Sequence, residues 1–366
     1  MHRYAGSRLL VIGVINREQI TFCAVPVVQD LIVWFGVTMN ILLTNNCNRK
    51  CPYCFAQERI SYRASEKGED LPRKAPRQIS REDYRTALDF VIGSGEKRVS
   101  LLGGEPSLHN EFIDLLEETR ALGLETTIFT NGIWGEKIVA AFSSRIKKGD
   151  PHLNLTVNVN HPDDTPSKEK EAQEFLLSIL GEFCALSFNI YREDFAPLFL
   201  IDIIERFRCK RHIRLGVAAP LAHHVNQHVD IVRYKHLSPT IMQLAKRCDG
   251  KDINIGFDCG FVLCMFSAEE LGKLHLANVR RRFDCGPALD VGTDLSVWPC
   301  FPLSTFSKGV HLRDFDDVKG ILKYFHKQFN RLYWTGAVSD CIECRYRKRK
   351  QCAGGCAAHV FRKVNP

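Results

Sequence analysis

Three cysteines near the start of the chain have a spacing that suits iron–sulfur chemistry. Cys47, Cys51 and Cys54 stand in the C-x3-C-x2-C stretch "CNRKCPYC". Three thiols match neither one disulfide nor a closed zinc site, whereas a [4Fe–4S] cluster held by three cysteines keeps one iron open. An open iron can bind a molecule that chelates through an amine and a carboxylate. Zinc with a fourth ligand elsewhere, or buried thiols without a metal, are the alternatives.

Small and polar residues follow the next two apolar runs. "LLGGEP" contains Gly103, Gly104, Glu105 and Pro106, and "TNG" in the following run contains Asn131. Glycines allow a backbone carbonyl to approach a ligand closely, and Glu105 adds an acceptor for a cationic amine. Tight turns use the same residue types, so the indication comes from their recurrence at the ends of consecutive runs.

A second group of eight cysteines lies toward the end of the chain. Its members are Cys259, Cys264, Cys285, Cys300, Cys341, Cys344, Cys352 and Cys356. Eight thiolates can ligate two four-iron clusters completely. Two structural zinc ions in four-cysteine ribbons are the alternative, since the C-x2-C pair at 341–344 also suits zinc.

Composition indicates a compartment in which thiols stay reduced. The 366 residues include 15 cysteines, and no clear signal peptide precedes them. Clustered cysteines in a large chain favour metal thiolates over a disulfide framework. No apolar run reaches the ~18 residues of a membrane span. We therefore expect a cytoplasmic protein with no membrane segment.

The net charge of +8 suits an acidic partner but does not require one. The run "RYRKRK" (345–350) has the composition of a nucleic-acid contact. It lies between expected metal ligands, however, and such runs are more often solvated loops. We therefore do not expect nucleic acid as a partner, although a zinc-bound nucleic-acid-binding protein stays open as an alternative.

Short β-prone runs alternate with amphipathic helical patterns through the first part of the chain. The expected strands are 40–44, 98–102, 126–130, 153–159, 186–191 and 213–218. From the second strand onward their starts are roughly 27 to 33 residues apart, which is the length of a βα unit. Six units predict a partial (β/α)6 TIM-like barrel, with a doubly wound sheet as the alternative.

In such α/β folds, ligands bind at the carboxyl ends of the strands, where the cysteine loop lies. We divide the chain into an N-terminal extension (1–38), in which 9–15 resembles a strand, a barrel (39–250) and a small cysteine-rich auxiliary cluster domain (251–366).

The combination of "CNRKCPYC" with "GGEP" one βα unit later resembles the radical S-adenosylmethionine (SAM) superfamily. The resemblance implies that the three cysteines hold a [4Fe–4S] cluster whose fourth iron binds the amine and carboxylate of SAM. The reduced cluster then cleaves SAM to methionine and a 5′-deoxyadenosyl radical. An external one-electron reductant of the flavodoxin or ferredoxin type is also implied.

The same resemblance implies contacts to SAM, named in this chain's numbering. Residues 103–106 would line the methionine amine, and Tyr53 would lie against the adenine. Asn131, Asn158 or Asn160, and Asn189 stand at strand ends where the carboxylate or ribose is expected. Val217 would touch the adenine.

The later cysteines resemble the SPASM extension of radical SAM enzymes that modify peptides and proteins. Cys285 and Cys300 are 15 apart as in that motif, but Leu295 stands where the family usually has Gly. The gap from Cys344 to Cys352 is also longer, and no cysteine follows Cys356. We expect one cluster on Cys285, Cys300, Cys356 and one of Cys259 and Cys264, and the other on Cys341, Cys344, Cys352 and the remaining thiol. One auxiliary cluster is the alternative.

The leading functional hypothesis is oxidative modification of a peptide or protein by radical SAM chemistry. A small-molecule substrate, such as a sugar, nucleoside or amino-acid derivative, is the second hypothesis. The sequence identifies no general acid or base.

Overall fold

The structure is a computed structural model that describes residues 8–16, 19–27, 38–57, 59–62, 76–146, 150–221, 226–277, 279–286, 288–306, 310–333 and 335–364. The chain divides into two compact units, Met1–Val37 and Thr38–Pro366. In the first unit, β1 (Arg8–Asn16) and β2 (Gln19–Val27) pair antiparallel. This pairing confirms the strand expected within residues 9–15.

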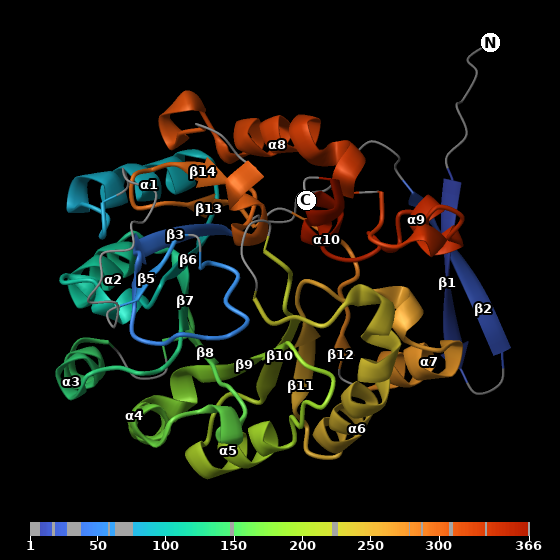
Figure 1. Ribbon diagram of the computed structural model, residues 1–366, viewed down its shortest axis with the longest axis horizontal. Coiled ribbons are helices and arrows are strands. Elements are labelled where there is room, and N and C mark those ends of the chain that lie inside the picture. Colours follow the sequence, from blue (N-terminus) through green and yellow to red (C-terminus); the bar gives the residue numbers. More distant parts are fainter. Residues whose placement is uncertain are drawn as a thin grey trace. The chain divides into compact units, whose positions relative to one another are not determined.

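The second unit is built on one sheet of 10 strands. From one edge to the other these are β12 (Val279–Arg280), β11 (Asn254–Phe257), β10 (His212–Val217), β9 (Cys184–Ile190), β8 (Leu153–Asn158), β7 (Glu125–Thr130), β6 (Arg98–Gly103), β3 (Met39–Thr44), β13 (Asp290–Val291) and β14 (Val297–Trp298). Every pair is parallel except β13 with β14. A parallel sheet of consecutive βα units is the predicted partial barrel, and Figure 1 shows helices around its outside.

Each of the six predicted strands is present, with ends shifted by two residues at most. The helices that follow them are α1 (Arg81–Gly93), α2 (Phe112–Ala121), α3 (Glu136–Arg145), α4 (Ser167–Leu180), α5 (Phe199–Phe207) and α6 (Ser238–Asp249). The hydroxyl of Ser80 caps α1 by accepting the backbone N–H of Asp83 at 3.0 Å. This cap fixes where α1 starts, and therefore the length of the chain that leads into it.

The core lies between the sheet and these helices. Ile41, Leu101, Ile128, Leu155 and Leu186, one on each of five neighbouring strands, are all 0% exposed. Parallel sheets bury both faces, which explains why these strands are apolar runs without strict alternation. The polar residues that carry chemistry are therefore confined to the strand ends.

Residues beyond 250 continue the same sheet at both edges. β11 and β12 extend it beyond β10, and β13 pairs with β3. The helices of this part are α7 (Ala268–Leu276), α8 (Val318–Tyr333), α9 (Arg345–Lys348) and α10 (Ala357–Val364). The division expected near residue 250 stays a prediction, and the sheet runs across it. Within the described residues, no helix has the length and apolarity that a bilayer crossing requires.

Candidate metal and cofactor site

The cysteine loop leaves the carboxyl end of β3, as the sequence predicts. The register of β3 against β6 shifts between Leu42 and Thr44, and the chain then forms the two-residue strand β4 (Asn46–Cys47). β4 pairs with β5 (Ser61–Tyr62) in a parallel pair outside the main sheet. Such irregularities redirect a chain at the rim of a barrel, and this one turns Cys47 out of the β3 direction.

The three thiols of the loop interact electrostatically. Burial is the main reason that the pKa of Cys47 rises to about 12, and the charges of Glu105, Cys51 and Cys54 contribute to this rise. Cys47 is 8% exposed, while Cys51 and Cys54 are half-buried. Thiols in this setting stay protonated at neutral pH unless a metal cation replaces the proton. Their proximity and their need for a cation fit a metal site.

Gly103 and Gly104 lie directly against the backbone of the cysteine loop. A Cβ added to Gly103 would stand 2.3 Å from the carbonyl oxygen of Thr44, and one on Gly104 would stand 2.2 Å from that of Asn46. The backbone N–H of Gly104 donates to Thr44 at 2.8 Å. The sequence explained these glycines by the approach of a ligand. In the structure they also allow the loop itself to pass, because any side chain would collide with backbone.

Glu105 is fully buried and its carboxylate is held by donors from its surroundings. Oε1 accepts from the hydroxyl of Thr130 at 2.8 Å, from the backbone of Ser107 at 3.2 Å and from the indole of Trp134 at 3.1 Å. Oε2 accepts from the backbone of Asn131 at 2.8 Å. Burial raises the pKa of this carboxyl, and these hydrogen bonds oppose the rise. The carboxylate therefore fixes the loops after β6 and β7 to each other.

Asn131 bridges from the end of β7 to the cysteine loop. Its Nδ2 donates to Oδ1 of Asn48 at 2.8 Å and lies 3.9 Å from Sγ of Cys47. Its backbone carbonyl accepts from Nε2 of Gln173 on α4 at 2.6 Å. Pro106 starts a short 3-10 helix and is buried beside Glu105. Asn131 therefore connects the cysteine loop to the end of β7 and to α4.

Tyr53 belongs to a polar network at the ends of β8 and β9. Its hydroxyl accepts from Nδ2 of Asn158 at 2.7 Å and donates to Oδ1 of Asn160. Asn189 donates to Oδ1 of Asn158 at 2.9 Å. The Tyr53 ring stacks on Tyr191 with centroids 4.7 Å apart. The asparagines singled out in the sequence are thus joined to the cysteine loop through one phenol.

The auxiliary cysteines interact as two groups, of which the first contains Cys259, Cys285, Cys300 and Cys356. Burial, followed by the charges of Cys356, Cys285 and Cys259, raises the pKa of Cys300 well above its usual value. The pKa of Cys259 is likewise raised by burial and by the charges of Cys285 and Cys356. Residue Cys259 is exposed as a whole, but its thiol is surrounded by protein. We name these four residues auxiliary set 1.

The second group contains Cys264, Cys341, Cys344 and Cys352. Burial raises the pKa of Cys264, and the charges of Cys352, Cys341 and Cys344 add to the rise. The pKa of Cys352 is raised by burial and by the charges of Cys341 and Cys344. We name these residues auxiliary set 2. The two upstream thiols, which the sequence could not assign, are placed with different sets.

None of the described parts of the chain brings three or more His, Cys, Asp or Glu side chains into position around a single metal ion. A zinc ion draws four sulfurs to ~2.3 Å from one centre. In a [4Fe–4S] cluster each cysteine binds a different iron, so the sulfurs stand farther apart.

Direct contacts connect the cysteine loop to the auxiliary cysteines. Phe55, next to Cys54, lies 5.8 Å from Phe301, next to Cys300. The backbone N–H of Val217, at the end of β10, donates to the carbonyl of Cys259 at 3.1 Å. The loop and auxiliary set 1 therefore belong to one packed region.

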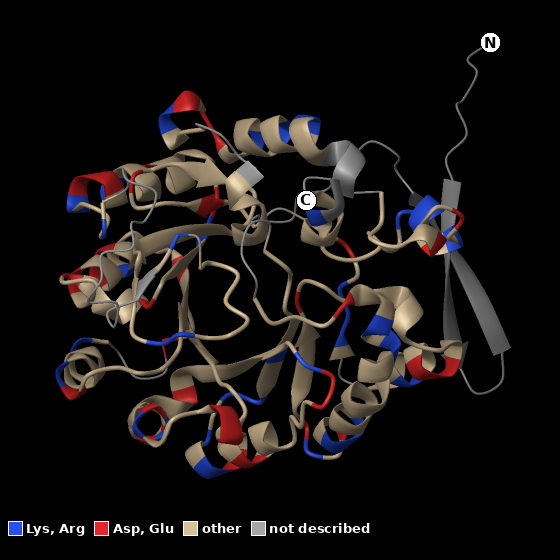
Figure 2. Cartoon of the chain, viewed as in Figure 1, with Lys and Arg blue, Asp and Glu red and all other residues tan. Residues whose placement is uncertain are grey.

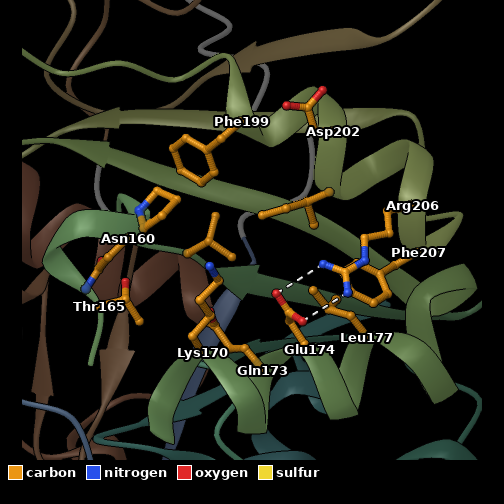
Figure 3. A pocket seen from close by; sticks show the side chains of 13 residues that line it. Asn160, Thr165, Lys170, Gln173, Glu174, Leu177, Phe199, Asp202, Arg206 and Phe207 are labelled. Atoms are coloured by element: carbon orange, nitrogen blue, oxygen red, sulfur yellow. Dashed lines mark hydrogen bonds and ion pairs between the residues drawn. The ribbon is translucent and has the colours of Figure 1, made fainter. Parts of the chain in front are cut away.

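A cavity of about 180 Å³ opens between α4 and α5, away from these cysteines. Figure 3 shows its charged side chains, including the ion pair of Arg206 with Glu174. Ligand sites usually have ≈ 300–1,000 Å³, so this cavity is smaller than most of them. Two of its lining residues connect it to the site, because Asn160 accepts from the Tyr53 hydroxyl and Gln173 donates to the backbone carbonyls of Asn131 and Asn158.

Two functional candidates carried no recognised signal in the sequence. Arg49, inside the cysteine motif, and Gln173, on α4, reach the strand ends only because of the fold. Figure 2 shows most charged residues on the outer helices, with Lys and Arg also gathered at α9, which contains part of the basic run 345–350.

Comparison with known proteins supports the interpretation of the first site. Residues 41–175 match the family model of the Radical SAM superfamily. A GTP 3′,8-cyclase of Listeria welshimeri is 25% identical over 130 residues, 34% of this chain and 34% of that protein. Molybdenum cofactor biosynthesis protein 1 of Bos taurus is 33% identical over 97 residues, 26% of this chain and 14% of that protein. The chain thus spans about a third of the cyclase that it matches.

Two solved structures share the fold over most of the chain. Streptococcus suis SuiB bound to precursor peptide SuiA has a TM-score of 0.60 at 14% identity, covering 89% of this chain and 73% of that one. Native anSMEcpe with bound AdoMet and a Cp18Cys peptide has a TM-score of 0.60 at 16% identity, covering 90% of this chain and 92% of that one. With the matched residues 41–175 enclosing all three cysteines of the loop, the chain contains a radical SAM domain.

Proposed function

We propose that this protein is a radical SAM enzyme that oxidatively modifies a peptide or protein. Cys47, Cys51 and Cys54 would hold a [4Fe–4S] cluster, and SAM would bind beside it. When bound and reduced, the cluster supplies the electron that cleaves SAM to methionine and a 5′-deoxyadenosyl radical. That radical abstracts a hydrogen atom from the substrate.

The residues around the loop are suited to shaping a SAM site. Gly103 and Gly104 keep the strand backbone close to the loop, and the saturated carboxylate of Glu105 fixes the loop after β7. We propose that residues 103–106 line the methionine amine through their backbone. Tyr53, Asn131, Asn158, Asn189 and Val217 remain the proposed contacts to the rest of SAM.

The observation that carries the oxidative assignment is the separation of eight thiols into two sets of four. Four thiolates can ligate a [4Fe–4S] cluster fully. Hydrogen abstraction leaves a substrate radical, and an oxidative product requires the loss of one more electron. We propose that auxiliary sets 1 and 2 each hold a cluster, and that these clusters accept this electron or bind the substrate.

The peptide assignment is supported by the fold. SuiB and anSMEcpe, which share the fold over most of the chain, were solved with peptides bound. We propose a peptide or protein substrate here, with an external flavodoxin or ferredoxin as reductant. Free thiols in this number suit the reducing cytoplasm.

The decisive experiment is anaerobic incubation of the iron-loaded protein with SAM and dithionite. Mass spectrometry should detect 5′-deoxyadenosine, and an added peptide substrate should increase its amount and become lighter by the mass of two hydrogen atoms. Stoichiometric zinc without iron would refute the radical assignment and favour the zinc-bound nucleic-acid-binding alternative.

A small-molecule substrate is the second candidate, and the sequence relatives favour it. The relatives matched over 130 residues or fewer include GTP 3′,8-cyclases of Listeria. Adding GTP to the same assay separates the two candidates. A GTP-dependent increase in 5′-deoxyadenosine, with none from peptides, would favour the small-molecule candidate.

A further inference from the structure

Arg49 is an arginine buried inside the cysteine loop. It lies between Cys47 and Cys51, and its side chain is 2% exposed. Its Nε donates to Oε2 of Glu169 on α4 at 2.8 Å, and Nη1 donates to the backbone carbonyl of Asn158 at 3.1 Å. Two sides of the guanidinium therefore connect the loop to α4 and to the end of β8.

The third nitrogen of this group has no acceptor. Nη2 of Arg49 is buried and finds no hydrogen-bond partner among the described residues. A buried N–H without an acceptor is costly, and one on a charged group more so. An arginine is always protonated, and its planar fork is matched in shape and charge by a carboxylate.

The surroundings of Arg49 are those of the proposed SAM site. The backbone carbonyl of Arg49 accepts from the thiol of Cys47 at 3.2 Å. Asn158, whose carbonyl accepts from Nη1, donates its side-chain amide to the Tyr53 hydroxyl at 2.7 Å. Glu169, the partner on α4, is 24% exposed and accepts from Nε rather than from Nη2. The nearby Glu105 carboxylate is already saturated by four donors. Nη2 of Arg49 is therefore available to donate to an anionic group of a bound ligand.

We propose that Nη2 of Arg49 binds the carboxylate of the methionine part of SAM. The proposal rests on the proposed function, because it assumes that SAM binds beside the cysteine loop. It assigns Arg49 a direct role in SAM affinity. The competing interpretation is that Arg49 only ties the loop to α4 through Glu169.

The test measures the dissociation constants of two probes on the anaerobically reconstituted protein by equilibrium dialysis. One probe is SAM, and the other is decarboxylated SAM, which keeps the adenosine, sulfonium and amine. Arg49→Gln is expected to weaken the binding of SAM by about 10- to 100-fold, because a charge-assisted hydrogen bond is lost. The same variant is expected to change the dissociation constant of decarboxylated SAM by less than about threefold.

Two further variants separate carboxylate binding from a purely structural role. Glu169→Gln removes the negative charge that pairs with Nε of Arg49 and should leave SAM affinity within about threefold of wild type. Arg206→Gln, which breaks the ion pair of α5 with Glu174 on α4, is the matched control for losing an arginine contact to this helix. If Arg49→Gln weakens both probes equally, or if Glu169→Gln reproduces its effect, the proposal is overturned.

Iron content, measured for each preparation, shows whether the loop still assembles. If Arg49→Gln loses iron, Arg49→Lys takes its place, because lysine keeps the charge but not the planar fork. A several-fold loss for SAM alone would support the proposal, and equal changes for both probes would overturn it. If the wild-type protein does not bind SAM, the proposed function itself is overturned. If the wild-type protein and the variant bind SAM equally well, only the role of Arg49 is overturned.

Discussion

The variants Cys259→Ala and Cys264→Ala are expected to remove iron independently, although the two cysteines are close in sequence. Cys259 interacts with the thiols of auxiliary set 1 and Cys264 with those of auxiliary set 2. An alanine leaves one iron of the affected cluster without a thiolate, and, unlike the open iron of the loop cluster, that iron has no SAM to fill the place, so we expect this cluster to be lost.

The expected iron contents follow from the numbers of thiols. One three-thiol loop and two four-thiol sets would hold about 12 irons in the wild-type protein. Each single variant should hold about 8 irons and the double variant about 4. Iron and acid-labile sulfide are measured after anaerobic reconstitution. The change in the EPR spectrum on adding SAM should persist in all three variants, because the cysteine loop is unaltered.

A second double variant tests membership of the sets. Cys259→Ala combined with Cys285→Ala affects only auxiliary set 1 and should remain at about 8 irons. Cys184→Ala, which removes a buried thiol of β9 outside both sets, serves as the control and should keep about 12. If the variant lacking both Cys259 and Cys264 loses no more iron than either single variant, the division into two sets is wrong.

Substitutions at three further positions, Glu105, Asp290 and Leu295, test the frame around the sites. Glu105→Gln should lower the free energy of unfolding by about 2 kcal/mol, because the glutamine amide cannot accept from every donor around it. Hydrogen exchange at the backbone amide of Asn131 should become faster in this variant. Burial raises the pKa of Asp290 to about 6, above the ~3.9 of an unfolded aspartate, so the free energy of unfolding falls by about 3 kcal/mol as the pH rises from about 4 to 6. Thermal unfolding midpoints should show this loss in the wild-type protein and not in Asp290→Asn. The same pH dependence in both proteins would contradict the prediction. Leu295 is buried with a φ of 59°, so Leu295→Gly should be more stable to urea than Leu295→Ala by about 1 kcal/mol. Buried Leu303, where φ is not positive, is the control: there the alanine variant should be more stable to urea than the glycine variant.

The central strands and their order could be predicted because they leave strong local signals. Apolar runs such as 126–130 are bounded by turns and separated by helical patterns, which is the pattern of βα units. The edge strands β12, β13 and β14 have two residues each and carry no periodicity, so their pairing with the barrel was not predictable. Their place depends on contacts made across the whole chain.

The site was predictable in its residue types but less so in its contacts. The sequence pointed to Glu105 as an acceptor for an amine, whereas in the structure four nearby donors occupy its carboxylate. The sequence also placed Cys259 and Cys264 in different clusters without deciding which thiol joins which, because proximity along the chain does not decide which thiols meet in space. The Leu295 position was noticed only as a departure from a motif, and its positive φ explains why glycine is usual there.

The close passage of Gly103 and Gly104 along the cysteine loop has a consequence for how the protein matures. Backbone hydrogen bonds from Gly104 to Thr44 and from Glu105 to Asn46, both 2.8 Å long, place Cys47 as part of the barrel rim. Zinc fingers, by contrast, fold only when the metal arrives. We expect the sheet to form first and to receive iron and sulfide afterwards, so that chain produced under iron starvation is a folded recipient for cluster delivery.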